Sequence, residues 1–245
     1  MILVFGGTTE GKQIAAILDA LEESYYYSTR TKVSFSGKGI PIYGTLTKGG
    51  IEEFCTQKKI KYIINASHPF ATELHATIAS IHHKIALIRW EREFTKRVTH
   101  KLVYYVDSFE KAIALFEEHN YQSLLALSGV QTISKLKTYW KKYATWFRIL
   151  DRDISRQIVR ESEFPFSKII YGYPQDNEEE MKLYKRLNPS VIFTKESGVN
   201  GKLAQKIQAA MQLKIPIVIL KKPLLPNRYL CIHTKDELID VLKSC

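Results

Sequence analysis

The sequence has few cysteines and no long hydrophobic run. Its three cysteines, Cys55, Cys231 and Cys245, lie far apart, and none belongs to a C-x-x-C pair. An odd number of scattered cysteines argues against a disulfide framework and against a zinc site. The opening apolar stretch ends at Gly6, and no window approaches the length of a membrane span. We therefore expect a cytoplasmic protein without a signal peptide or a membrane segment.

Acidic residues are in the minority. The chain has 36 Lys and Arg against 25 Asp and Glu, a net charge of +11, which predicts an anionic partner. The basic residues are spread along the chain, and short clusters such as Lys58-Lys59 lack a reading helix or an aromatic RNA-binding motif. We therefore expect no nucleic-acid partner, since a small substrate with several carboxylates would account for the charge equally well.

Strand and helix patterns alternate along almost all of the 245 residues, which predicts an α/β fold. The regular pattern stops between about residues 89 and 100 and then resumes. We expect two Rossmann-like subdomains with parallel sheets and an interdomain cleft, a dinucleotide-binding subdomain at 1–99 and a second subdomain at 100–245. The expected strands are 2–5, 25–29, 40–43, 62–65, 84–88, 102–106, 123–127, 145–149, 168–171, 191–194 and 217–220. The expected helices are 12–21, 50–58, 70–82, 109–118, 133–139, 155–161, 177–187, 201–213 and 235–242.

The first expected strand runs into the loop G-G-T-T-E-G-K-Q at residues 6–13. This loop fits half of a Walker A motif, but Gln13 stands where a magnesium-binding Ser or Thr is needed. It is not G-x-G-x-x-G either. Two glycines at a strand end, two hydroxyls and a helix N-terminus nevertheless favour a phosphate site. A plain tight turn between strand and helix is the alternative interpretation.

A second polar turn, N-A-S-H-P-F-A at residues 65–71, follows another apolar strand. Pro69 suits the first turn of a helix and Ser67 suits its N-cap, so a structural role accounts for both. It does not account for His68, which we expect to form hydrogen bonds in a cleft or to lie on the surface. His68 and His75 are seven residues apart without a nearby third ligand, so we expect no metal.

Two further strand ends carry polar residues. The segment F-T-K-E-S-G-V-N-G-K at residues 193–202 contains two lysines, a serine and two glycines, which favours a second anion site, with a solvated loop as the alternative. The turn Ser128-Gly129 follows the strand at 123–127, and we expect it to help close the interdomain cleft.

Taken in order, these segments resemble the precorrin-6A reductase family, the NAD(P)H-dependent enzymes of corrin-ring biosynthesis, including the cobalt-precorrin-6A reductases. The resemblance covers about residues 1–223. It rests on a G-G-T-x-E loop at 6–10, a D-A-T-H-P-F/Y-A turn at 65–71, a K-x-S-G-x-x-G-K turn at 195–202 and a terminal strand followed by a basic residue and Pro at 217–223. The chain departs from the family in having Asn65 and Ser67 for Asp and Thr, Gly172-Tyr173-Pro174 for Gly-Pro-Phe, and Ser128 for Thr.

The resemblance implies hydride transfer from a reduced nicotinamide to the C18=C19 double bond of a precorrin macrocycle. The acetate and propionate arms of that tetrapyrrole would account for the net charge of +11. It implies a pyrophosphate site at Gly6, Gly7, Thr8, Thr9 and Glu10. It places the nicotinamide near Ser67, His68 and Pro69, with His68 as the candidate catalytic residue. The implied anion-binding residues of the second subdomain are Ser128, Lys195, Ser197, Gly198 and Lys202.

The residues after the second strand bear on the choice of coenzyme. NAD-specific folds commonly place an acidic residue there to bind the ribose 2′-hydroxyl, whereas this chain has Arg30 and Lys32. We expect Arg30 or Lys32 to meet a 2′-phosphate, and so expect NADPH, with NADH as the alternative.

Two rival functions remain. One is a reductase of another small acidic substrate, and the other is a basic nucleic-acid-binding module, which would show salt-dependent retention on nucleic acid. The sequence leaves the cobalt content of the substrate, the proton donor and the oligomeric state open.

Overall fold

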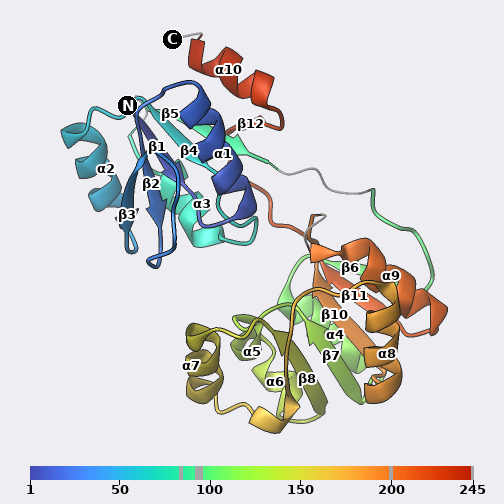
Figure 1. Cartoon of the computed structure of the whole chain (residues 1–245). Coiled ribbons are helices and arrows are strands. Elements are labelled where there is room, and N and C mark those ends of the chain that lie inside the picture. The colour runs from blue at the N-terminus through green and yellow to red at the C-terminus, as the bar shows by residue number, and fades with distance from the viewer. Residues whose placement is uncertain (83–84, 92–95, 199–200, 244–245) are drawn as a thin grey trace. The chain divides into compact units, whose positions relative to one another are not determined.

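The computed structural model describes residues 1–82, 85–91, 96–198 and 201–243, and it confirms an α/β fold with two parallel six-stranded sheets (Figure 1). The chain divides into two compact units. The first consists of Met1–Glu93 and Pro223–Cys245, and the second of Phe94–Lys222. The interdomain cleft expected from the sequence stays a prediction.

The first unit has the strand order of a dinucleotide-binding fold. Its sheet runs β3-β2-β1-β4-β5-β12 with all neighbours parallel, which is the order 3-2-1-4-5-6 when β12 is counted as the sixth strand. The order of the strands therefore reverses between β1 and β4. The elements are β1 (Ile2–Phe5), α1 (Thr9–Ala20), β2 (Tyr25–Thr29), β3 (Ile40–Tyr43), α2 (Lys48–Gln57), β4 (Tyr62–Asn65), α3 (Thr72–Ala79), β5 (Ala86–Trp90), β12 (Leu230–Ile232) and α10 (Lys235–Lys243).

The four central strands of the first sheet are covered on both faces. Alternate residues of a strand point to opposite faces, so β1, β2, β4 and β5 each contribute to two cores. On one face Ile2, Val4 and Ile64 pack with side chains of α1 and α10. On the other face Leu3 and Ile63 pack with side chains of α2 and α3. This double burial explains why β1 and β4 read as uninterrupted apolar runs.

The second unit repeats the architecture with a different strand order. Its sheet runs β6-β11-β10-β7-β8-β9, again with all neighbours parallel, and the order reverses between β7 and β10. The elements are β6 (Val103–Val106), α4 (Phe109–Glu118), β7 (Ser123–Leu127), α5 (Thr132–Lys135), α6 (Lys137–Trp140), β8 (Ala144–Ile149), α7 (Asp153–Glu161), the 3-10 helix η1 (Phe166–Lys168), β9 (Ile169–Tyr171), α8 (Asn177–Leu187), β10 (Val191–Lys195), α9 (Leu203–Gln212) and β11 (Ile217–Leu220).

The C-terminal segment corrects the expected boundary of the second subdomain. The sequence assigned residues 100–245 to that subdomain, but β12 pairs with β5 of the first sheet, with Leu230 opposite Ile88. β12 could not be predicted from the sequence, because it has three residues, two of them exposed, and so carries no alternating apolar pattern. The first unit is therefore completed by residues that follow the whole second unit.

Side-chain caps explain where several helices begin. Thr8 caps α1, Ser108 caps α4 and Asp176 caps α8, and each side-chain oxygen accepts a backbone N–H three residues later. The cap at Thr8 moves the start of the first helix to Thr9, ahead of the expected residue 12. Among the described helices, none has both the length and the apolar character that a membrane crossing requires.

Replacing Leu238 by Ala tests whether the C-terminal helix stabilises the first unit. Leu238 is fully buried in the core beneath α1 and α10, so its truncation is expected to cost about 2–5 kcal/mol of unfolding free energy. Hydrogen exchange should accelerate at the amides of β1 and β4 and stay unchanged in β7 and β10. Leu224→Ala, at a side chain 97% exposed, is the control. Equal acceleration in both sheets would contradict the assignment of this segment.

Candidate functional site

In each unit the structure brings two of the polar strand ends together. In the first unit β1 and β4 are neighbours and Phe5 pairs with Asn65. Residues 6–10 and 66–71 therefore follow the carboxyl ends of two adjacent strands and lie side by side. In the second unit β7 and β10 are neighbours and Leu127 pairs with Thr194, which places Ser128 beside Lys195. Both pairs lie where the strand order reverses, which is where open parallel sheets bind ligands.

A hydroxyl group joins the two loops of the first unit. Thr8 Oγ1 accepts a hydrogen bond from Gly11 N at 3.0 Å, as the cap of α1, and donates to the carbonyl of Ala66 at 2.6 Å. Thr8 therefore holds the start of α1 against the end of β4. Glu10 lies in the first turn of α1 and is buried.

Glycines let the N-terminus of α1 approach the sheet closely. A Cβ on Gly6 would lie 2.2 Å from Cζ of Tyr27, and a Cβ on Gly11 would lie 2.7 Å from Cα of Gly6. Gly7 has φ +84° and donates its N–H to Tyr27 Oη at 3.1 Å. The close approach of Tyr27 thus requires glycine at positions 6 and 11, and the positive φ favours glycine at position 7.

The start of α1 fits a phosphate group. Within the described part of the chain, the N–H groups of Thr8 and Thr9 meet no acceptor. First-turn amides of a helix lack intrahelical partners and carry the positive end of its dipole. Such amides beside a glycine-rich turn are a common way to bind phosphate.

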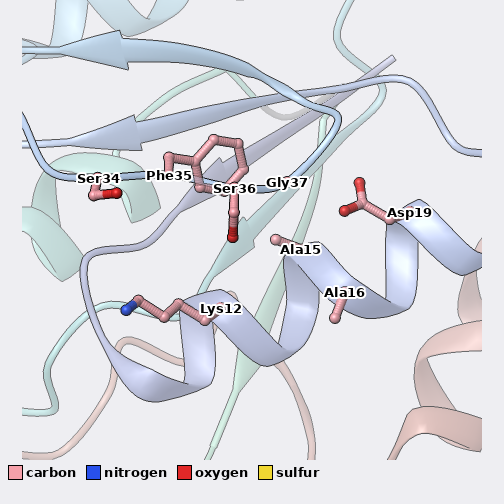
Figure 2. Close-up of a pocket in the computed structure, with 8 residues that line it drawn as sticks. All are labelled: Lys12, Ala15, Ala16, Asp19, Ser34, Phe35, Ser36 and Gly37. Atoms are coloured by element: carbon pink, nitrogen blue, oxygen red, sulfur yellow. The ribbon is translucent and has the colours of Figure 1, made fainter.

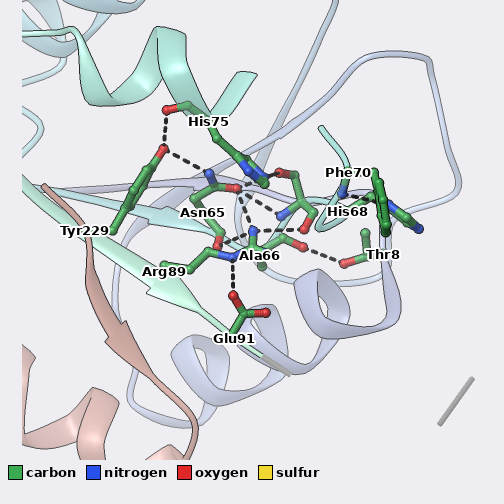
Figure 3. A network of polar contacts seen from close by, with 10 residues as sticks. Thr8, Asn65, Ala66, His68, Phe70, His75, Arg89, Glu91 and Tyr229 are labelled. Carbon is green, nitrogen blue, oxygen red and sulfur yellow. Dashed lines mark hydrogen bonds and ion pairs between the residues drawn. The ribbon is translucent and has the colours of Figure 1, made fainter. Parts of the chain in front are cut away.

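A buried arginine organises the loop that follows β4 (Figure 3). The Oδ1 atom of Asn65 accepts hydrogen bonds from Ser67 N at 3.1 Å, from Ser67 Oγ at 2.6 Å and from Arg89 Nη1 at 3.2 Å. Arg89 Nη1 also donates to the carbonyl of Asn65 at 3.2 Å and to that of Ser67 at 2.9 Å. Its Nε lies 3.8 Å from a carboxylate oxygen of Glu91, which supplies the opposite charge.

The same network extends to the C-terminal segment. Asn65 Nδ2 donates to Tyr229 Oη at 3.1 Å, and Tyr229 Oη donates to the carbonyl of His75 at 2.9 Å. The ring of His75 lies with Nε2 3.2 Å from Ser67 Oγ. Because that hydroxyl donates to Asn65, it can accept a hydrogen bond from His75 when the ring proton is on Nε2. Burial and the nearby charge of Arg89 lower the pKa of His75 to about 4, so the ring is neutral.

The helix after this loop begins later than expected, which changes the role of Ser67. α3 starts at Thr72 with Ala71 at its N-cap and no side-chain cap, so the expectation that Ser67 caps the helix was wrong. The Ser67 hydroxyl is instead buried in the network described above, and Pro69 is also buried. His68 is exposed, and its Nδ1 accepts the N–H of Phe70 at 3.2 Å. A neutral His68 ring therefore carries its proton on Nε2.

The second unit gathers cations and hydroxyls where β7 and β10 end. Lys195 is half-buried, and burial lowers its pKa to about 8. The Ser128 hydroxyl lies 2.7 Å from Thr132 Oγ1. Ser197 and Gly198 follow on the β10 side, and Lys202 lies just before α9 with φ +48°. Val199 and Asn200, which belong to the expected turn at 195–202, lie outside the described residues.

Glu196 holds this second loop in place. Its carboxylate accepts hydrogen bonds from Arg97 at 2.8 and 3.0 Å and from the backbone N–H of Lys222 at 2.9 Å. Burial would raise the pKa of Glu196, but these hydrogen bonds lower it below its usual value. The carboxylate of Glu196, the residue next to Lys195 in the sequence, therefore has Arg97 and the backbone N–H of Lys222 as partners.

Several residues of both sites could not be identified from the sequence, namely Tyr27, Arg89, Arg97, Glu196 and Tyr229. Their partners lie far along the chain: the contact of Asn65 with Tyr229 spans 164 residues. One local signal was present, because a charged residue at the buried end of A-L-I-R-W needs a polar partner.

The two residues expected to meet a 2′-phosphate, Arg30 and Lys32, follow β2 and are exposed. Within the described residues no group of three or more His, Cys, Asp or Glu side chains forms a metal site.

Comparisons with known proteins agree with one another. The family model described as "Precorrin-6x reductase CbiJ/CobK" matches residues 1–243. The chain is similar to the cobalt-precorrin-6A reductase of Methanocaldococcus jannaschii, at 24% identity over 99% of this chain and 98% of the relative. It is similar to that of Priestia megaterium, at 27% identity over 91% of each chain. A solved "CobK precorrin-6A reductase" has the same fold, with a TM-score of 0.77 at 19% identity over 99% of this chain and 96% of that one.

The neutral, buried state of His75 predicts a pH-dependent stability. A histidine whose pKa is lowered from 6.5 to about 4 on folding favours the unfolded state as the pH falls through this window. Between about pH 7 and pH 5 the loss should be about 2 kcal/mol of unfolding free energy. Urea unfolding should show this loss in the natural protein and a smaller one in His75→Gln. Identical pH dependence of the two proteins would show that His75 is not a buried neutral ring.

Proposed function

We propose that this chain, which belongs to the precorrin-6x reductase CbiJ/CobK family, uses NADPH to reduce the C18=C19 double bond of (cobalt-)precorrin-6A. One observation carries the proposal. The glycine-rich loop after β1 and the Ser67-His68-Pro69 turn after β4 leave adjacent strands where a 3-2-1-4-5-6 sheet reverses its order. That is the place where dinucleotide-binding folds hold their cofactor.

The first unit supplies the residues that would hold the coenzyme. The pyrophosphate would meet the N–H groups of Thr8 and Thr9 at the start of α1, where the helix dipole favours negative charge. Gly6 and Gly7 keep this surface free of side chains. When bound, the reduced nicotinamide supplies the hydride for the reaction.

The loop after β4 would face the nicotinamide. Reducing a carbon–carbon double bond requires one hydride and one proton, so the protein or the solvent must deliver the proton. His68 is the candidate, because its ring is exposed on this loop and, as an imidazolium, could deliver one proton and regain it from the solvent. Arg89, Asn65 and Ser67 fix the backbone of this loop and so position His68. They are positioning residues rather than reacting groups.

The second unit would bind the carboxylate arms of the tetrapyrrole. Lys195 and Lys202 provide cations, and Ser128 and Ser197 provide hydroxyls, around the ends of β7 and β10. Attraction between a lysine and a carboxylate is stronger in a half-buried site than in water. Because Arg97 and Lys222 occupy Glu196, its charge is already compensated when a second carboxylate arrives.

The test is the oxidation of NADPH by the purified protein with cobalt-precorrin-6A and with cobalt-free precorrin-6A. Both substrates are needed, since the relatives from Methanocaldococcus jannaschii and Priestia megaterium are named for the cobalt form and the relative from Rhodobacter capsulatus is named "Precorrin-6A reductase". We expect substrate-dependent loss of nicotinamide absorbance with at least one of them. No oxidation with either substrate would overturn the proposed function.

Replacing His68 by Asn tests its role as the proton donor. Asn keeps an acceptor for the N–H of Phe70 but has no proton to deliver, so the single-turnover rate should fall roughly 10²–10⁴-fold. Coenzyme affinity should fall much less than the rate, because the groups proposed to bind the pyrophosphate are the N–H groups of Thr8 and Thr9. A rate unchanged from the natural protein would remove His68 from the mechanism.

The lowered pKa of Lys195 predicts how substrate binding changes with pH. With a pKa of about 8, the ammonium is largely protonated at about pH 7 and largely neutral at about pH 9. The KM for the tetrapyrrole should therefore rise up to about tenfold over this range. In Lys195→Gln the KM should be high at both pH values, and Lys195→Arg should have a low KM at both. A Gln variant with the natural pH profile would contradict this role.

A further inference from the structure

A cavity lies along α1, outside the loops that the proposed function uses. It has a volume of about 230 Å³ and lies between α1 and the segment that follows β2 (Figure 2). Lys12 of α1 and Ser34 and Ser36 of that segment line it. Each of these polar side chains is exposed, and Lys12 has no ion-pair partner within the described residues.

The polar groups of the cavity are arranged unevenly. Lys12 and Ser34 lie toward the start of α1, whereas Asp19 lies at the other end of the cavity (Figure 2). The Asp19 carboxylate accepts hydrogen bonds from Tyr25 Oη at 2.7 Å and from Lys38 N at 3.0 and 3.2 Å. The negative charge of Asp19 is thus stabilised by hydrogen bonds within the protein. The Lys12 end of the cavity is left positive and rich in donors.

The segment that carries the two serines is held firmly. The ring of Phe35 stacks on Tyr27, with centroids 4.2 Å apart and planes at 12°, and meets Tyr25 edge-on at 6.5 Å. A Cβ on Gly37 would lie 2.5 Å from the Phe35 ring, so this glycine is needed for the packing. Because the segment is anchored on both sides of Ser36, little ordering is required before it binds a ligand.

The place of the cavity in the fold indicates which ligand it would take. Lys12 directly follows Gly11 of the pyrophosphate loop, and Ser34 lies a few residues beyond the end of β2. Dinucleotide-binding folds place the adenosine ribose at the end of the second strand, where its 2′ position distinguishes NAD from NADP. A lysine with two hydroxyls suits a phosphate monoester, which has several acceptor oxygens.

We propose that Lys12, Ser34 and Ser36 bind the 2′-phosphate of NADPH and thereby select NADPH over NADH. This inference rests on the proposed function for the presence of a coenzyme. It assigns the selection to the cavity rather than to Arg30 and Lys32, which the sequence favoured. Those two residues follow β2 but do not line the cavity.

Calorimetric titration with adenosine 2′,5′-bisphosphate and with adenosine 5′-monophosphate tests the inference without any turnover. Lys12→Gln should bind the bisphosphate roughly 10–100-fold more weakly, because a charged hydrogen bond is lost, and bind the monophosphate within about twofold of the natural protein. Lys12→Arg should retain most of the affinity. Lys61→Gln is the matched control, since it removes one exposed positive charge just before β4. Lys61 lies at the amino ends of the strands of the same sheet, whereas the Lys12 end of the cavity lies near their carboxyl ends.

Three results would overturn the inference. In the first, Lys12→Gln weakens both nucleotides equally, which would place Lys12 on the 5′-phosphate. In the second, Arg30→Gln loses the bisphosphate while Lys12→Gln does not. In the third, the natural protein binds the bisphosphate no more tightly than the monophosphate, and this would still leave an NADH-dependent reductase intact. Conversely, selective bisphosphate binding without reduction of either precorrin would support the cavity and overturn the proposed function.

Discussion

The pairing of β1 with β4 is the constraint on which the candidate site depends. It places the glycine-rich loop beside the Ser67-His68-Pro69 turn at the reversal point of the sheet. The hydrogen bond from Thr8 to the carbonyl of Ala66 then joins the two loops. Neither loop would be more than an ordinary turn without the other. The chemistry proposed here therefore follows from the strand order before it follows from any single side chain.

The hydrogen-bond network around the loop after β4 explains why an amide can stand at position 65, where the family that the sequence resembles usually has Asp. Asn65 uses its oxygen to accept three hydrogen bonds and its nitrogen to donate to Tyr229. A carboxylate would satisfy the three donors but would have no proton for Tyr229. The positive charge of Arg89 is met by Glu91 instead. Asn65 is fully buried, so its role is to shape the loop.

Local patterns predicted much of the fold, and long-range contacts account for most of what they missed. The buried strands β1, β4, β7 and β10 read as apolar runs followed by polar turns, so the four strand ends could be chosen from the sequence. The three-residue β12 has no such pattern, and its place in the first sheet depends on tertiary packing. The same holds for Tyr229, because its hydroxyl contacts residues more than 150 positions earlier. The cap at Ser67 failed because α3 begins at Thr72.

The central claim is that the coenzyme lies across the loops that follow β1 and β4. Hydrogen exchange measured with and without NADPH tests it most directly, because it reports the backbone amides that the coenzyme protects. We expect slower exchange at residues 6–11 and 66–71 when NADPH is added. Protection confined to the loops after β7 and β10, or none anywhere in the chain, would contradict it.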